Sequence, residues 1–280
     1  MKHALIIANT EYTDPSLREL YAPGKDAEDF ARVLKSKEFA AFDHVTTMVN
    51  ETAANLREAI DDFFYRKQTD DLLLLYFSGH GIKDEFGNLY LAVKNTKKSH
   101  LRSTAIDSSF IRVGMDQCQS IRQVIILDCC NSGAFPEGSK AEIGGSMGTS
   151  EAFQGRGVGR VVLTASDSTQ YAWEGSKVSG DSSNSIFTEY LIKGLEGGAD
   201  RDDDGKITVD DLYIYTYDQV TRKTTRQTPR KFTFAQQGEI AIRELTEEQR
   251  QIREDLKKQT ELKRQEEERQ RIAQEEEKRL

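Results

Sequence analysis

Short, continuous apolar runs are the sequence feature that most restricts the fold of this chain. They occur at 4–8, 72–77 and 124–127, and their apolar residues do not alternate with polar ones. A strand that is apolar on both faces must be covered on both faces, which is typical of parallel sheets. Helical spacing lies between the runs, for example Ala27, Phe30 and Leu34. The sequence therefore predicts an α/β sandwich with a mainly parallel central sheet flanked by helices.

The same patterns predict the order of the elements. We expect strands over 4–8, 44–49, 72–77, 124–127 and 160–166, a short hairpin arm over 89–93 and a last extended segment over 232–242, with helices over 26–36, 53–66, 108–117, 186–195 and 212–220. The stretch 134–159 is rich in Gly and Ser and lacks periodicity, so we expect a flexible linker loop there.

Charge divides the chain into two parts. The 280 residues carry a net charge of −8, and 12 acidic and 10 basic residues lie within 244–280 alone. We expect a folded domain over 1–243 and a charged helical tail over 244–280, because Glu, Lys, Arg and Gln favour helices. The tail's few apolar residues do not sustain a coiled-coil seam, so we expect it to join the domain to a partner or a further domain.

Composition excludes several classes of protein. No apolar run approaches the roughly 20 residues that span a bilayer, and the start of the chain lacks a signal-peptide pattern. Three cysteines do not make a disulfide framework and suit a reducing compartment. The acidic balance offers no basic patch. We therefore expect a cytoplasmic protein that binds neither nucleic acid nor a membrane.

Two predicted strands end in residues that can do nucleophilic chemistry. His80 lies in Ser-Gly-His-Gly and Cys130 in Asp-Cys-Cys-Asn-Ser-Gly. Ligands bind at the carboxyl ends of parallel strands, and an imidazole there can take a thiol's proton. The backbone amides of Gly81 and Cys130 are candidate oxyanion donors. Because side chains alternate along a strand, Cys130 shares a face with Asp128, and Cys129 is expected in the core. Taken alone, each motif also fits a tight turn or a core cysteine.

Taken together and in order, the motifs resemble a known family. The matching segments are 4–9 with Tyr12, 25–27, 74–81, 128–133, 164–166 with Gln170, 186–188 and 194–195. The sequence is similar to prokaryotic caspase-like cysteine peptidases of the metacaspase and paracaspase branch. Cys130 follows His80 by 50 residues, the separation typical of caspases. The resemblance implies a protease whose catalytic dyad is His80 and Cys130. Asn131 departs from the family, which often carries His there, but lies outside the dyad.

Acidic residues point to the substrate. Asp128 lies two residues before Cys130 on the same strand face, where a carboxylate needs a partner such as a substrate Arg or Lys. The resemblance assigns Asp26 and Glu174 to the same substrate-binding pocket. Alternatives are a helix N-cap for Asp26 and an exposed loop acid for Glu174. We expect cleavage of protein substrates after Arg, then Lys.

The acidic segment 200–211 fits a twelve-residue calcium loop. Carboxylates occupy positions 1, 3, 5 and 12, Gly occupies position 6, and helices are expected on both sides. The candidate Ca²⁺ ligands are Asp200, Asp202, Asp204, Lys206, Thr208 and Asp211. Asp at position 12 reaches less far than the usual Glu, and a solvated acidic turn is the alternative.

Two further expectations concern regulation. Caspase-like enzymes are often cut in the loop after the nucleophile, where Lys140, Arg156 and Arg160 are candidate self-cleavage sites. By resemblance we expect a self-processing peptidase of a bacterial stress or defence pathway. The alternative is a catalytically silent caspase-like scaffold or a calcium-responsive interaction module.

Overall fold

The computed structural model describes residues 1–129, 153, 159–165, 184–225, 227–234 and 238–277, without the side chains of 253, 256, 257, 267, 268 and 270–277. The chain divides into two compact units, Met1–Arg243 and Glu244–Leu280. The second consists mainly of the helix α8 (Glu247–Glu277), in agreement with the charged helix expected there. Within the described residues, the helices are too short or too polar to cross a membrane.

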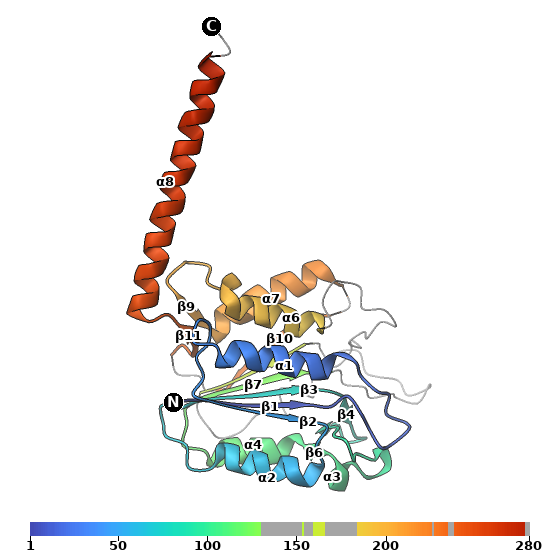
Figure 1. The fold of residues 1–280 in the computed structure, drawn as a ribbon. Helices are drawn as coiled ribbons and strands as arrows, with labels where there is room; N and C mark the ends of the chain where they lie inside the picture. The colour runs from blue at the N-terminus through green and yellow to red at the C-terminus, as the bar shows by residue number, and fades with distance from the viewer. Residues whose placement is uncertain (130–152, 154–158, 166–183, 226, 235–237, 278–280) are drawn as a thin grey trace. The chain divides into compact units, whose positions relative to one another are not determined.

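A six-stranded sheet forms the centre of the first unit (Figure 1). Its strand order is β10-β8-β7-β3-β1-β2, and every neighbouring pair is parallel except β10 with β8. The bounds are β1 (Lys2–Ala8), β2 (His44–Val49), β3 (Leu72–Ser78), β7 (Arg122–Asp128), β8 (Arg160–Thr164) and β10 (Arg230–Phe234). The predicted mainly parallel sheet is confirmed.

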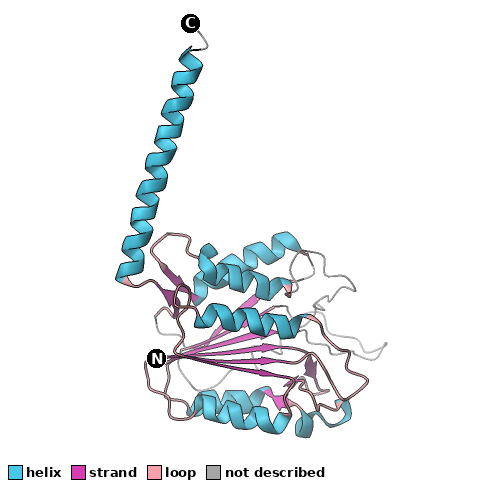
Figure 2. Cartoon of the chain, viewed as in Figure 1, coloured by secondary structure: helices cyan, strands magenta, loops and turns pink. Residues whose placement is uncertain are grey.

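Helices cover both faces of this sheet, as Figure 2 shows. One face carries α1 (Ala22–Lys35), α6 (Ile186–Lys193), the π-helical turn η2 (Gly194–Gly198) and α7 (Val209–Lys223), and the other α2 (Ala53–Phe64) and α4 (Ser108–Gln117). Alternate residues of β1 divide between two cores, with Ile6 in the first and Leu5 and Ile7 in the second. This two-sided burial explains why the strands are continuous apolar runs.

A small antiparallel sheet lies beyond the carboxyl ends of the central strands. It consists of β4 (Gly81–Lys83), β5 (Leu89–Leu91) and β6 (Ile106–Asp107), in the order β4-β5-β6. The predicted hairpin arm corresponds to β5. Between β5 and β6 the chain forms the short helices η1 (Lys98–His100) and α3 (Leu101–Thr104). This layer begins directly after His80 and so forms one side of the candidate site.

Two expectations need correction. The predicted single segment 232–242 is two strands in different sheets, β10 and β11 (Ala241–Glu244), and β11 pairs with β9 (Lys206–Thr208). The expected flexible linker 134–159 contains Phe153, whose side chain is fully buried in the second core. An aromatic side chain gains hydrophobic free energy on burial, so Phe153 itself does not fit a flexible linker. The rest of that stretch, apart from Gly159, lies outside the described residues.

Candidate active site

The ends of β3 and β7 bring the two predicted reactive motifs side by side. Ser78 pairs with Asp128 in the parallel register, and the Gly79 N–H donates to the Asp128 carbonyl at 3.3 Å. His80 therefore follows one strand at the same edge where Cys129 and Cys130 follow its neighbour. Cys130 itself lies outside the described residues.

The imidazole of His80 is held by backbone on one side. Its Nε2 lies 2.7 Å from the carbonyl oxygen of Arg18. Because a carbonyl only accepts, Nε2 carries the proton of the neutral ring and Nδ1 keeps its lone pair. The Tyr12 ring packs against the imidazole with centroids 5.0 Å apart. The Tyr12 hydroxyl accepts from the His80 N–H at 3.1 Å and donates to the Asn9 carbonyl at 3.1 Å.

Its surroundings keep the His80 ring neutral. Burial lowers the pKa of His80 below its ordinary value, and the positive charges of Arg18 and Lys98 lower it further, whereas the hydrogen bond to the Arg18 carbonyl raises it. A neutral imidazole with a free Nδ1 lone pair has the state that a general base requires.

Cys129 behaves as a core residue. It is 7% exposed and belongs to the second hydrophobic core, on the α2 and α4 side of the sheet. Asp128, one residue earlier, turns to the opposite face, where it meets α6. The predicted alternation along β7 is confirmed for these two residues.

The carboxylate of Asp128 is buried at the start of α6. Its Oδ2 accepts from the Thr188 hydroxyl at 2.7 Å and from the Ser185 hydroxyl. Ser185 is the N-cap of α6, because its Oγ also accepts from the Thr188 N–H at 3.1 Å. The Tyr76 hydroxyl lies 2.7 Å from the Thr188 hydroxyl and completes the chain of hydrogen bonds.

Asp26 joins the same network from α1. The Ser185 N–H donates to its Oδ1 at 2.9 Å, whereas its Oδ2 is buried without a hydrogen-bond partner among the described residues. The alternative assignment of Asp26 as a helix N-cap is wrong. The helix begins at Ala22 with Tyr21 as its N-cap, and Asp26 lies one turn inside on the buried face.

Burial raises the pKa of both carboxyl groups. For Asp26 the nearby charge of Asp128 raises it further, and for both groups hydrogen bonds from Ser185 act in the opposite direction. Both acids resist ionisation and share Ser185 as a partner. A nearby cation would stabilise their ionised forms. Glu174, the third predicted acid, lies outside the described residues, as does Asn131.

Of the two backbone amides expected to stabilise the oxyanion, only that of Gly81 lies within the described residues. Gly81 begins β4 opposite Leu91 and is buried beside His80, and the Cys130 amide lies outside the described residues. The oxyanion assignment of both amides stays a prediction.

The acidic loop gathers three of its six candidate ligands. Carboxylate oxygens of Asp200, Asp202 and Asp204 lie within 4.8 Å of one another, and the Gly205 N–H donates to Asp200 Oδ2 at 3.1 Å. Asp211 is engaged differently: its Oδ2 accepts from the N–H of Thr208 at 3.0 Å and from its hydroxyl at 2.6 Å, in a capping box of α7. Three clustered carboxylates suit a hard cation such as Ca²⁺.

Among the self-cleavage candidates, Arg160 is unsuited to cleavage in the folded chain. It is 0% exposed in β8, and its Nη2 lies 2.6 Å from a carboxylate oxygen of Asp116. A protease needs an extended, accessible segment, which a central strand does not offer. Lys140 and Arg156 lie outside the described residues.

Sequence reasoning did not find several residues of this site. The carbonyl of Arg18 carries no side-chain signal, so nothing in the sequence could identify it. Ser185, which caps Thr188, could have been detected in the sequence, because a Ser before an apolar helical run is typical of an N-cap. Their second role, as donors to Asp128, depends on α6 lying beside the end of β7.

Comparisons with known proteins agree with this fold. A family model described as the caspase domain matches residues 1–252. Caspase-1 from Spodoptera frugiperda is 13% identical, with a TM-score of 0.61, and the match covers 87% of this chain and 92% of that one. The Drosophila initiator caspase Dronc is 12% identical, with a TM-score of 0.59 and coverage of 86% and 82%.

A structural-genomics protein from Geobacter sulfurreducens is also similar, at 17% identity, with a TM-score of 0.58 and coverage of 83% of this chain and 93% of that one. At such identities the structures show a common fold. No curated protein matches the sequence. The family model spans most of the chain, and so the chain belongs to the caspase domain family, whose general activity is that of a cysteine peptidase.

Proposed function

We propose that this chain is a cysteine endopeptidase that cuts proteins after Arg and, less well, after Lys. One observation carries the proposal: Asp26 and Asp128 meet through Ser185 at the end of β7, beside β3, which His80 follows. The substrate's basic side chain would supply the positive charge that this pair lacks.

His80 and Cys130 form the proposed dyad. Nδ1 of His80 takes the thiol proton, the Cys130 thiolate attacks the peptide carbonyl, and the C–N bond then breaks as the imidazolium returns the proton to the leaving amine. Water then attacks the acyl carbon while His80 takes its proton. The C–S bond breaks, and the Cys130 thiolate regains a proton from the imidazolium. The hydrogen bond from Nε2 to the Arg18 carbonyl supports this assignment, because it fixes the tautomer with a free Nδ1.

Preference for Arg follows from the geometry of guanidinium. Its planar fork can donate to two acceptors, and Asp26 Oδ2 is a buried acceptor without a hydrogen-bond partner among the described residues. Lys brings the charge without the fork. An Asp side chain in the same position would meet two carboxylates and be excluded by repulsion. Glu174 is proposed as a third acid of this pocket.

Fluorogenic peptides that differ only in the residue before the scissile bond test the proposal. Turnover should be fastest after Arg, slower after Lys and negligible after Asp, and Asp128→Ala should remove most of this preference. Cys130→Ala should abolish turnover, while the matched variant Cys129→Ala should keep most of it. Efficient cleavage after Asp contradicts the pocket, and equal loss in both folded cysteine variants contradicts the choice of nucleophile.

The proposed preference for basic residues agrees with the resemblance to the metacaspase and paracaspase branch and differs from that of caspases that cut after Asp. A role in bacterial stress or defence stays an expectation from the resemblance. Self-processing is proposed at Lys140 or Arg156, since Arg160 is buried. Intact-mass measurement should find a nicked wild-type chain and a whole Cys130→Ala chain, and a fully active uncut chain contradicts self-processing.

Calcium binding by the acidic loop is a second proposal. The proximity of Asp200, Asp202 and Asp204 supports it, as does the pairing of β9, inside the loop, with β11. Asp202→Asn should weaken Ca²⁺ binding in calorimetry and remove any Ca²⁺-dependent rise in stability. Asp203→Asn is the matched control, since the position is not a candidate ligand and its φ of 64° suits Asn. Equal binding by wild type and Asp202→Asn contradicts the site.

A silent scaffold is the competing function, with the tail as its partner-binding element. Exposed Ile252 and Leu262 are apolar positions on α8 that a partner helix would cover. The cysteine and pocket variants above separate this function from the enzyme, because a scaffold turns over none of the substrates.

A further inference from the structure

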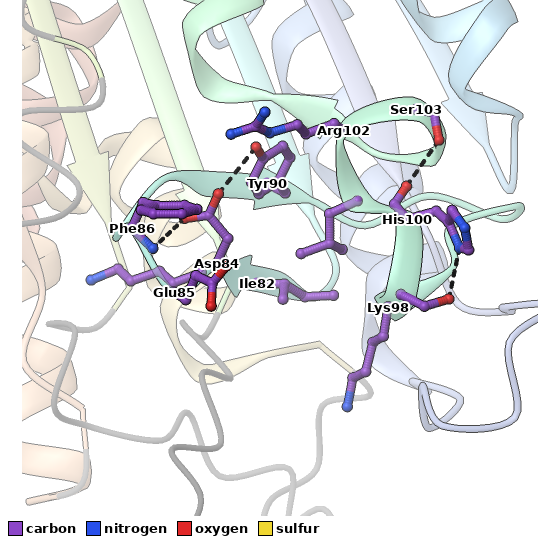
Figure 3. A pocket seen from close by; sticks show the side chains of 12 residues that line it. Ile82, Asp84, Glu85, Phe86, Tyr90, Lys98, His100, Arg102 and Ser103 are labelled. Atoms are coloured by element: carbon purple, nitrogen blue, oxygen red, sulfur yellow. Dashed lines mark hydrogen bonds between the residues drawn. The ribbon is translucent and has the colours of Figure 1, made fainter. Parts of the chain in front are cut away.

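A groove lies beside β4, the strand that begins one residue after His80. It is a cavity of about 840 Å³ between the β4–β5 hairpin and the segment η1–α3. Its apolar lining includes Ile82, Phe86, Tyr90 and Leu101, and Phe86 is 72% exposed. Figure 3 shows Phe86 and Tyr90 on the hairpin side and Lys98 and His100 on the opposite side. A volume of this size accommodates a few side chains of a peptide.

The groove begins two residues after His80 along the chain. Strand β4 begins at Gly81, the residue after His80, so the Ile82 lining is two residues from the proposed base. The Ala92 N–H donates to the His80 carbonyl at 2.8 Å and ties the next strand segment to the same point. The charge of Lys98 is near enough to lower the pKa of His80. A peptide segment that extends from His80 along β4 would meet the groove.

The net charge that the groove offers to a ligand is positive. Three basic side chains line it, Lys83, Lys98 and Arg102, against two acidic ones, Asp84 and Glu85. Lys98 and Arg102 are exposed. Asp84 keeps its charge but is held within the hairpin: it accepts from the N–H groups of Phe86 at 3.0 Å and Asn88 at 2.9 Å and from the Asn88 amide at 2.9 Å. The exposed Glu85 is the remaining acid of the lining.

We propose that this groove, here the hairpin groove, binds the part of the substrate that follows the scissile bond and prefers acidic residues there. The inference rests on the proposed peptidase function. In that reaction the C–N bond breaks while a Cys130 S–C bond forms, and the leaving nitrogen takes the proton that His80 received from the thiol. The leaving segment therefore lies on the His80 side, where β4 and the groove begin. The acidic pair binds the residue before the bond, and the two cations bind residues after it.

Quenched peptides test the preference on the leaving side. Three peptides share an acyl segment ending in Arg and continue with Asp-Asp, Ala-Ala or Lys-Lys, and a coumarin amide with the same acyl segment has no leaving peptide. Surface ion pairs change a rate constant by up to about fivefold each, so kcat/KM should be about fivefold to tenfold higher for Asp-Asp than for Lys-Lys. High salt should reduce the difference, since the cations are exposed.

The double variant Lys98→Glu, Arg102→Glu should reverse the order of the peptides. Lys98 also acts on His80, and the coumarin amide corrects for that effect because it reports the dyad without the groove. Lys97→Glu is the matched control: it is the neighbouring exposed lysine and does not line the groove. It should keep the wild-type order.

Two failures are distinguishable. Turnover of the coumarin amide with no charge preference among the peptides, or an order that the double variant does not change, overturns the groove and leaves the peptidase standing. If no substrate is turned over, the peptidase proposal fails. Fluorescence anisotropy of a labelled acidic peptide then decides on the groove alone: binding by wild type and Lys97→Glu but not by the double variant supports it, and equal binding by all three overturns it.

Discussion

Neutralising Asp26 should stabilise the protein while weakening its action on basic substrates. Asn has nearly the shape of Asp, and its Oδ1 can keep the hydrogen bond from the Ser185 N–H. Its Nδ2 replaces an acceptor that is buried without a hydrogen-bond partner among the described residues. The substitution therefore fixes a neutral side chain beside Asp128 and leaves the packing of α1 against the sheet unchanged.

The sign of the effect follows from the raised pKa of Asp26. In the unfolded chain the carboxyl ionises near its ordinary pKa, whereas burial and Asp128 oppose ionisation in the folded one. The folded state therefore binds more protons, and wild-type stability falls as the pH rises from about 4 toward the folded pKa. Asp26→Asn lacks this loss. Relief of such functional-site strain typically gives about 0.5–2 kcal/mol at neutral pH, and each kcal/mol raises Tm by about 2–4 °C in a domain of this size.

Equilibrium urea unfolding of wild type and Asp26→Asn at pH 7 and pH 4 measures this. The stability gain should be present at pH 7 and shrink at pH 4, and kcat/KM for an Arg peptide should fall at pH 7. Asp29→Asn is the matched control on the same helix. Asp29 is 2.9 Å from the Lys25 ammonium, so its neutralisation removes an ion pair and should not stabilise. A loss of stability in Asp26→Asn that is equal at both pH values refutes the reasoning.

Three further predictions concern the dyad and the core. Tyr12→Phe removes the acceptor of the His80 N–H and should lower kcat by up to about tenfold with KM nearly unchanged. The control Tyr21→Phe, at an exposed position, should have no effect on kcat. Equal falls in kcat for both variants contradict the positioning role. Because burial lowers the pKa of His80, the acid limb of the kcat/KM profile should lie below pH 6.5, and a limb above that value contradicts a neutral base. Asp116→Ala leaves the guanidinium of Arg160 buried without its ion pair. It should lower the free energy of unfolding in urea by about 3–5 kcal/mol, far more than Arg112→Ala. Similar losses for the two variants contradict this account.

The central sheet was predictable because its determinants are local. Burial on both faces requires continuous apolar strands, so 72–77 predicted β3 (Leu72–Ser78) and 44–49 coincided with β2 (His44–Val49). The end of the chain differed, because 232–242 includes parts of two strands that pair in different sheets, β10 with β8 and β11 with β9. Partner choice is a tertiary property that propensity does not contain.

The candidate site divides in the same way. His80 and Asp128 could be predicted because motif and strand alternation place them at a strand end. The N-cap alternative for Asp26 failed because a carboxylate before an apolar run is also compatible with the buried face of a helix that begins a turn earlier. The hairpin groove had no signal, since Lys98 and Arg102 belong to short helices with no periodicity of their own.

Covalent labelling tests the central claim most directly. A peptidyl chloromethylketone ending in Arg should inactivate the protein and leave one adduct, which peptide mass spectrometry should locate on Cys130 and not on the buried Cys129. The same reagent ending in Asp should label far more slowly, and His80→Ala should label slowly with either. An adduct on Cys129, equal labelling by both reagents, or no adduct on the folded wild-type chain contradicts a peptidase whose dyad lies beside an acidic pocket.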